Sequence, residues 1–331
     1  MNEYERRAAQ AGIHRIAVPT PFQVGRVNAY LIEDEPLTLV DSGPHSERSL
    51  AELEAGLATL GHRVEDLELL VISHQHMDHF GLAAALAERS GAEVAALDLL
   101  VPVLGDYEAF NDREEEFAQR VMLRHGIPDE MVDGLRAVLP AFRRWGQAVQ
   151  ITRPLREGDT LEFANRRLEV LHRPGHSPSD TVLYDRERGI LIAADHLLAH
   201  ISSNPVIALA LPERGGAERT RSLVQYLDSL ERTRELDLDI VLTGHGDPLG
   251  AHRELIDQRL RLHERRAAKI AGLVDERPRT AHEVALEMWG NIAVTQSYLT
   301  LSEVVGHADL LVRDGRTVET ERDGVTVYES A

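Results

Sequence analysis

The chain has 331 residues, enough for two domains, and its 43% hydrophobic and 27% charged content excludes a disordered protein. Its 36 basic and 55 acidic residues give a formal net charge of −19, which disfavours nucleic acids and other polyanions as partners. Cysteine is absent, so disulfides and thiolate metal ligands are excluded. No apolar stretch approaches the ~20 residues that span a bilayer, and the charged start MNEYERRAAQ lacks a signal core. We expect a cytoplasmic protein without a membrane partner.

Strand-like and helical segments alternate in the first part of the chain. From residue 13 to about 100, the runs RIAV, VNAYLIED, LTLVD and LELLVIS have the length and β-branched content of strands, and ERSLAELEAGLATLG has helical spacing. Residues 106–150 are wholly helical in pattern. Strands resume with LEFANRRLEVLH, DTVLYD, GILIAAD and LDIVLTG. We therefore expect an α/β domain over residues 1–250 with a helical insertion at about 106–150.

A different unit follows the sequence TGHGDP. One long helix is expected over about residues 253–274, a second begins with the capping box TAHE, and a third spans roughly residues 295–312. The end GRTVETERDGVTVYES predicts a hairpin that turns at Asp323-Gly324. Three helices and a hairpin indicate a winged-helix-like domain over residues 251–331. Its first helix could pack against the first domain or form a homodimer.

The stretch VISHQHMDHF, residues 71–80, places His74, His76, Asp78 and His79 at the end of an apolar strand. Imidazole and carboxylate groups are ligands of divalent zinc, iron and manganese. His74 and His76 can project from the same side of the strand end, whereas Asp78 and His79 lie where the chain turns into a helix. One short segment could thus serve two metal ions. A chance run of surface histidines is the alternative interpretation.

Further ligand candidates follow later apolar strands: His176 in LHRPGHS, Asp195 in LIAADH and His245 in VLTGHGD. Each lies between a strand and a loop, and a glycine precedes both histidines, which lets the backbone approach closely. Any one of them alone would more often be an ordinary loop residue. Together with the first cluster they supply enough ligands for two adjacent ions.

The motifs LVDSG, SHQHMDH, RPGHS, AADH and TGHGD occur in one order over residues 13–250, and this set resembles the metallo-β-lactamase superfamily, which includes glyoxalase II. The resemblance implies an αββα sandwich with two mixed sheets, outer helices and two metal ions at one edge. It also implies that Asp41 holds a ligand histidine in place, although a turn-capping aspartate is the alternative. The tail resembles the winged-helix-like extension of a subgroup. The implied ligands are His74, His76 and His176 for one ion, Asp78, His79 and His245 for the other, and Asp195 as the bridge.

The family chemistry implies two divalent ions that share a hydroxide, which attacks an ester, thioester, lactone or related bond of a small organic substrate. Zinc is the first expectation, with iron and manganese as alternatives. Asp78 and Asp195 could move the proton, and Asp78 is the favoured donor. Lactonases of the superfamily often carry a tyrosine shortly after the bridging aspartate, whereas HLLAH follows Asp195 here.

The helical insertion could cover the metals as a lid and form an apolar pocket for an acyl chain or a bulky ester. Its bulky side chains could instead only pack two helices together. The weaker candidates for substrate contact are Phe142, Trp145, His196, His200, Ser203 and Asn204.

Three rival functions stay open. A metal-dependent ribonuclease or phosphodiesterase is disfavoured because residues 251–331 carry 11 basic against 14 acidic residues. A sulfur dioxygenase would use one iron ion and would leave the second set of ligands altered, whereas here that set is complete. A regulatory binding protein on a degenerate scaffold is disfavoured by the same intact ligands.

Overall fold

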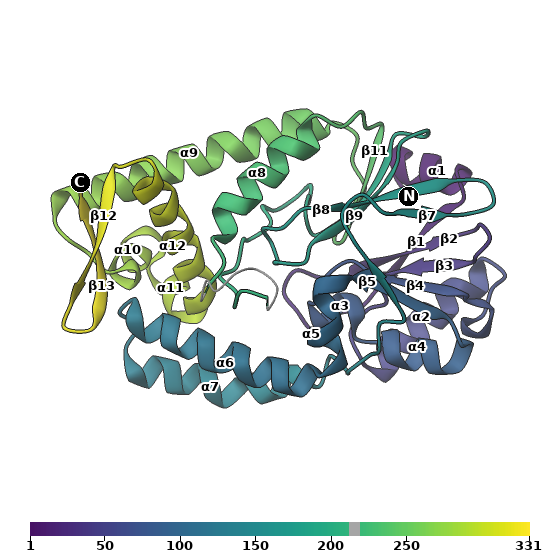
Figure 1. The fold of residues 1–331 in the computed structure, drawn as a ribbon, viewed down its shortest axis with the longest axis horizontal. Coiled ribbons are helices and arrows are strands. Elements are labelled where there is room, and N and C mark those ends of the chain that lie inside the picture. The colour runs from purple at the N-terminus through teal and green to yellow at the C-terminus, as the bar shows by residue number, and fades with distance from the viewer. Residues whose placement is uncertain (212–218) are drawn as a thin grey trace.

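The structure, a computed structural model, describes residues 1–211 and 219–331. Two β-sheets lie face to face, and helices cover the outer face of each (Figure 1). The predicted αββα sandwich with two mixed sheets is therefore confirmed. A helical region and a small hairpin extend from one end of this sandwich (Figure 1).

The first sheet has six strands in the order β1-β2-β3-β4-β5-β6. β1, β2 and β3 pair antiparallel, and β3 to β6 pair parallel. Every residue of β2, β3 and β4 is buried, as expected for strands that are covered on both faces. The strands are β1 (Ile13–Val18), β2 (Val27–Ile32), β3 (Thr38–Val40), β4 (Leu69–Ile72), β5 (Glu93–Leu97) and β6 (Arg153–Leu155).

The second sheet has five strands in the order β11-β10-β9-β8-β7. β7 to β10 pair antiparallel, whereas β10 and β11 pair parallel. β9, β10 and β11 are buried along their whole length. The strands are β7 (Thr160–Glu162), β8 (Arg167–His172), β9 (Thr181–Asp185), β10 (Ile190–Ala194) and β11 (Ile240–Thr243).

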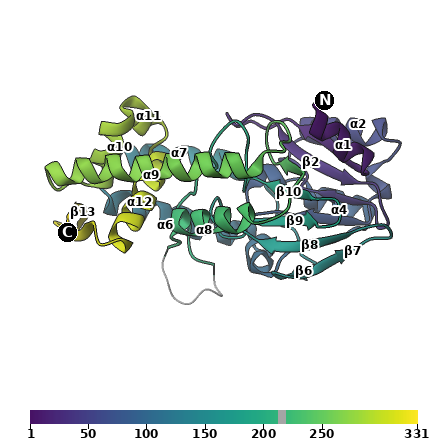
Figure 2. The ribbon, with the colours of Figure 1, turned by 90° about the horizontal axis from the view of Figure 1, so that it is seen from above.

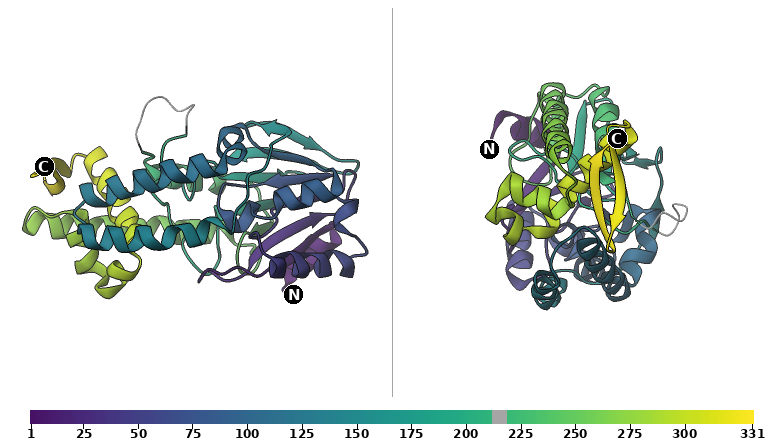
Figure 3. Two further views of the ribbon diagram at one scale, coloured as in Figure 1. Left: turned by 90° about the horizontal axis from the view of Figure 1, so that it is seen from below. Right: turned by 90° about the vertical axis from the view of Figure 1, so that its left-hand side faces the viewer.

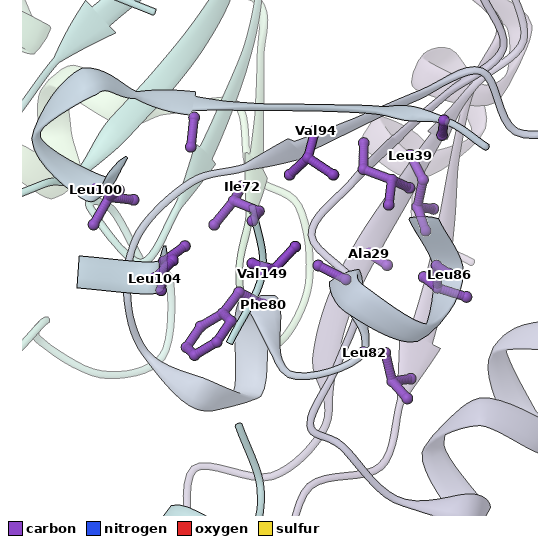
Figure 4. Packing of buried hydrophobic residues seen from close by; sticks show 14 of the residues in the cluster. Ala29, Leu39, Ile72, Phe80, Leu82, Leu86, Val94, Leu100, Leu104 and Val149 are labelled. Carbon is purple, nitrogen blue, oxygen red and sulfur yellow. The ribbon is translucent and has the colours of Figure 1, made fainter. Parts of the chain in front are cut away.

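Apolar side chains hold the sandwich together, both between the two sheets and on the outer face of each sheet. Between the sheets, side chains such as Val71 and Ile192 form a buried cluster. On the outer face of the first sheet, Ile72, Val94 and Leu86 belong to one buried cluster, part of which Figure 4 shows. Leu86 belongs to α4, and Leu53 of α2 joins the same cluster. The helices on or near the sandwich are α1 (Glu3–Gln10), α2 (Glu47–Thr59), α3 (Met77–Phe80), α4 (Ala83–Ser90), α5 (Val101–Gly105) and α8 (Ser222–Arg234).

The expected helical insertion is present as α6 (Tyr107–Arg124) and α7 (Asp129–Arg143), which lie side by side (Figure 3). The start of α6 packs against the sandwich, where Phe110 joins the cluster of the first sheet. Its end packs against the C-terminal helices, where Phe117 joins a separate cluster. The insertion therefore connects the two parts of the molecule.

The C-terminal region has the predicted order of helices followed by a hairpin, with one additional short helix. The side chain of Thr280 caps α10 in a capping box with Glu283, and the hairpin turns at Asp323-Gly324, where both residues have positive φ. The winged-helix relationship and a division at residue 250 stay predictions. The elements are α9 (His252–Glu276), α10 (Ala281–Trp289), α11 (Asn291–Thr295), α12 (Ser297–Arg313), β12 (Thr317–Arg322) and β13 (Val325–Ser330).

Helix α9 runs from the sandwich into the C-terminal region (Figure 2). Near its start, Ile256 packs in the cluster on the outer face of the second sheet. Near its end, Ile270 and Val274 pack in the cluster of the C-terminal region. Among the described residues, no helix combines the length and the hydropathy that a bilayer crossing requires.

We predict that Leu301→Ala lowers the free energy of unfolding by about 2–5 kcal/mol, because Leu301 lies buried in the C-terminal cluster with the end of α6. Leu286→Ala is the matched control: this side chain is 38% exposed, so the loss should be about 1 kcal/mol or less. Urea unfolding measures both. Equal losses of unfolding free energy in the two variants would contradict a hydrophobic core shared by α6 and the C-terminal helices.

Candidate metal centre

The ligand candidates gather where strands of both sheets end. His74 and His76 follow β4, and Asp78 and His79 lie in α3, which begins directly after His76. Asp195 and His245 follow β10 and β11, which are parallel neighbours. Because the carboxyl ends of parallel strands meet at the same edge of a sheet, their following residues converge. His176 reaches the same place from the loop between β8 and β9.

One group of three ring nitrogens belongs to His74, His76 and His176. His74 Nε2 lies 3.1 Å from His76 Nδ1, and His176 Nε2 lies 2.9 Å from the same Nδ1 atom. Three nitrogens at these separations can share one cation. The structure thus brings together the three residues that the family resemblance implied for the first ion.

A second group consists of Asp78, His79 and His245. His245 Nε2 lies 3.4 Å from Asp78 Oδ2, and all three side chains are buried. These are the residues that the family resemblance implied for the second ion.

Asp195 lies between the two groups. Its Oδ2 is 3.4 Å from His176 Nε2, in the first group, and 3.5 Å from His245 Nε2, in the second. Its Oδ1 is 3.4 Å from His79 Nε2. One carboxylate thus reaches both sets of nitrogens, as a bridging ligand must.

The chemistry of these donors fits divalent cations. His176 Nδ1 donates to the carbonyl oxygen of Asn204 at 3.2 Å, so its Nε2 presents a lone pair to the other rings when the ring is neutral. Within residues 1–211 and 219–331, His79 Nε2 and Asp195 Oδ1 are buried and have no hydrogen-bond partner, although they face each other at 3.4 Å. Such buried polar atoms are costly unless another group binds them. Imidazole and carboxylate suit zinc, iron and manganese alike.

The protonation of the rings is consistent with this use. Burial, together with the neighbouring His176, lowers the pKa of His76 to about 3. Burial also lowers the pKa of His74 well below its ordinary value. Although burial raises the pKa of Asp195, the adjacent His79 and His245 bring it well below the ordinary value. His74 and His76 therefore offer neutral rings, and Asp195 offers a carboxylate. Although burial lowers the pKa of His79 and His245, the neighbouring Asp195 raises it above the ordinary value of a histidine.

Asp41 fixes the orientation of two ligand candidates. Its Oδ2 accepts a hydrogen bond from His79 Nδ1 at 2.7 Å. The same carboxylate accepts from the backbone N–H of Ser73 at 2.9 Å and from its hydroxyl at 2.8 Å. Ser73 Oγ in turn lies 2.9 Å from His74 Nδ1. Such outer contacts set the tautomer and direction of metal-binding histidines.

The backbone beside the ligands is unusually constrained. A Cβ atom at Gly244 would lie 2.1 Å from Asp195 Oδ1 and 2.9 Å from His79 Cε1, so only glycine fits before His245. Ala194 has φ of +44°, a conformation that non-glycine residues rarely adopt. Strain of this kind is tolerated at sites where it aims a functional side chain, and here that side chain is Asp195.

A cavity of about 560 Å³ opens onto the two groups. His76, Asp78, His176, Asp195 and His245 lie in its wall. Most of the remaining wall is apolar and comes from segments far apart in the sequence. It includes Phe22, Met77, Phe110, Leu198, Ile207 and Leu299.

The weaker substrate candidates take different positions. Ser203 and Asn204 line the cavity. Phe142 stacks on Phe22, which lines the cavity, with ring centroids 6.2 Å apart.

The other three candidates lie outside the cavity wall. The ring of Trp145 lies 4.7 Å from the guanidinium carbon of Arg144. His196 is buried, and its Nε2 lies 2.8 Å from Thr233 Oγ1. His200 lies against Gly246, where an added Cβ would meet its ring.

Several residues at the site are not among the candidates predicted from the sequence. Ser73 directly precedes His74, and a hydroxyl at that position was a usable signal. Tyr298 and Leu299 reach the cavity from α12, more than 200 residues after the first ligands in the chain. No local sequence pattern marks them, since only the packing of α12 against the insertion brings them there.

The chain is similar in sequence to several known proteins. The model of the metallo-beta-lactamase superfamily matches residues 23–245. The probable metallo-hydrolase YqjP of Bacillus subtilis is 33% identical over 316 residues, which cover 95% of this chain and 96% of YqjP. The acyl-coenzyme A thioesterase MBLAC2 of Gallus gallus is 28% identical over 240 residues, 69% of this chain and 75% of MBLAC2.

A solved structure extends the similarity to the C-terminal region. A metallo-beta-lactamase family protein from Thermus thermophilus superposes with a TM-score of 0.81 at 28% identity. The match covers 97% of this chain and 99% of that protein. The helical insertion and the C-terminal helices are therefore shared with that relative.

We predict that Asp41→Ala weakens zinc binding by about 10- to 100-fold, because His79 and Ser73 lose the acceptor that orients them. Asp34→Ala is the matched control. The Asp34 side chain is 1% exposed, against 3% for Asp41, but it pairs with Arg166 instead. Competition with a chromophoric chelator measures both affinities. Equal affinities in the two variants would exclude the orienting role.

Proposed function

The chain belongs to the metallo-β-lactamase superfamily, and from this premise we propose that it is a dinuclear metal-dependent hydrolase that cleaves esters or thioesters of apolar acyl groups. The observation that carries the proposal is the apolar cavity that ends on two adjoining groups of histidine and aspartate side chains. The name of YqjP, probable metallo-hydrolase, supports the reaction class. The name of MBLAC2, acyl-coenzyme A thioesterase, supports the type of bond.

We propose that one ion is held by His74, His76 and His176 and the other by Asp78, His79 and His245. Asp195 would contact both ions. Two such ions supply an acidified water nucleophile and Lewis-acid polarisation of the bond that is cleaved. Zinc remains our first expectation.

The side chains of the protein would orient the substrate and handle the proton. Asp78 lines the cavity, and its Oδ2 is next to His245. We propose that this carboxylate takes up the proton that hydrolysis releases and passes it to the leaving group. Asp195 would share this role. The apolar walls would exclude bulk water from the reacting bond, which strengthens the electrostatic interactions within the cavity.

The character of the cavity favours an acyl substrate over the rival substrates. Phe110, Ile207 and Leu299 offer apolar surface, which stabilises a hydrocarbon chain by burial but gives nothing to a phosphodiester backbone. A glyoxalase II-like thioester hydrolysis falls within the same proposal.

The direct test is hydrolysis of octanoyl-coenzyme A, an octanoyl aryl ester, a lactone and single-stranded RNA by the zinc-loaded protein. We predict thioester or ester hydrolysis that a chelator abolishes and added metal restores. His76→Ala should lower kcat/KM on the order of 100-fold or more, since loss of a ligand exceeds the 10- to 100-fold effect of its outer contacts.

Other results would redirect the assignment. Activity that survives His76→Ala would come from a contaminant. Cleavage of RNA alone would favour the ribonuclease alternative. One iron per chain by metal analysis, together with oxygen uptake, would favour the dioxygenase.

We also predict that Phe110→Ala lowers the preference for octanoyl over acetyl thioesters by about 10-fold, because burial of an aromatic side chain against the acyl chain contributes about 1.5 kcal/mol or more. Phe117→Ala is the matched control on the same helix, since Phe117 lies in the C-terminal cluster instead of the cavity. It should reduce the melting temperature and leave the preference unchanged. A control that shifts the preference equally would refute the cavity as the acyl site.

A further inference from the structure

Helix α6 presents one continuous stripe to the cavity. Tyr107, Phe110, Asn111 and Glu114 line its wall and lie at positions i, i+3, i+4 and i+7, which share one helix face. Tyr107 packs against Phe80 with ring centroids 5.3 Å apart, and Phe80 is the neighbour of His79. Glu114 lies two turns further along, about 10 Å from Tyr107 at the helical rise. The stripe thus leads from the metal centre to a carboxyl group.

Glu114 lies in the cavity wall and is half-buried. Its Oε1 accepts a hydrogen bond from the backbone N–H of Leu209 at 3.0 Å. Within residues 1–211 and 219–331, no side chain forms an ion pair with it and no second donor contacts it. The hydroxyl of Tyr298 in the same wall already donates to the carbonyl oxygen of Ile207 at 2.6 Å.

The half-buried carboxyl group of Glu114 has hydrogen-bonding capacity that its contacts do not use. Burial raises the pKa of Glu114 to about 7, against the smaller opposing effect of the Leu209 N–H. The hydrogen bond to Leu209 uses only part of the acceptor capacity of a carboxyl group. Anchoring Leu209 alone would need only a neutral acceptor. The second oxygen is therefore available to a ligand in the cavity.

We propose that Glu114 determines specificity by accepting a hydrogen bond from the end of the acyl chain remote from the scissile bond. The preferred substrates would then be ω-functionalised acyl esters or thioesters whose terminal group, such as a hydroxyl, is a donor. This inference rests on the proposed function, because it takes the cavity as the acyl site. A site built to hydrogen-bond a polar group rejects analogues that lack it more strongly than an apolar site selects by size.

The first test uses the wild-type, zinc-loaded protein and measures the binding of product-like acids by calorimetry. The three probes are octanoate, ω-hydroxyoctanoate and ω-methoxyoctanoate, of which only the second carries a terminal donor. We expect ω-hydroxyoctanoate to bind about 10-fold more tightly than either of the other two, as the pairing of a desolvated carboxyl group predicts. Equal affinities for the three would overturn the proposal.

The second test compares variants on the same helix. Glu114→Leu should lose the preference for ω-hydroxyoctanoate and bind octanoate at least as tightly as the wild type does. Glu116→Leu is the matched control, because Glu116 is exposed, and it should keep the wild-type preference. Melting temperatures show whether Glu114→Leu stays folded without its bond to Leu209. A preference that persists in folded Glu114→Leu would reduce Glu114 to an anchor of that loop.

The binding readout separates this inference from the function on which it rests. If the zinc-loaded protein binds none of the three acids and hydrolyses neither octanoyl substrate, the cavity is not the acyl site and both proposals fail. If it binds all three equally and hydrolyses octanoyl-coenzyme A, only the role of Glu114 is wrong.

Discussion

The site depends on one constraint, which is the crowding of histidine nitrogens and carboxylates in a buried space. Ring nitrogens of His74, His76 and His176 face one another at hydrogen-bonding distance, and Asp78 and Asp195 bring two carboxylates to their edge. His79 and His245 stabilise the carboxylate of Asp195, whereas the facing lone pairs of the three histidines need a shared proton or cation between them. Metal binding and stability are therefore linked, since a ligand that binds the folded chain stabilises it by mass action.

The two sheets make this concentration of charge geometrically possible. β4 delivers His74 and His76, β10 delivers Asp195 and β11 delivers His245, all at the same edge of the sandwich. The buried strands are held by apolar packing on both faces, so the large core offsets the cost of the strained, charged edge. Asp41 and Gly244 add local precision, one by hydrogen bonds and the other by leaving space.

The sequence predicted the residues that converge at this edge because each of them follows a strand whose apolar pattern is local. The capping box at Thr280 and the turn at Asp323-Gly324 were predictable for the same reason. The wall of the cavity was not predictable from the sequence. It depends on how α12 and the loop around Ile207 pack against α6, and tertiary packing of this kind leaves no periodic signal. The size of Trp145 makes it a candidate for substrate contact, but size does not reveal which way a side chain faces.

The ligand candidates and the cavity wall come from different parts of the molecule. The ligand candidates lie almost entirely at strand ends, whereas the cavity wall also includes Leu299 and Tyr298 from the C-terminal region. Helix α6 packs against the sandwich at one end and the C-terminal cluster at the other, and substitutions in α6 or α12 change the cavity wall without replacing any ligand candidate. Substrate choice can therefore diverge while the metal chemistry stays fixed, which is how one fold carries many specificities.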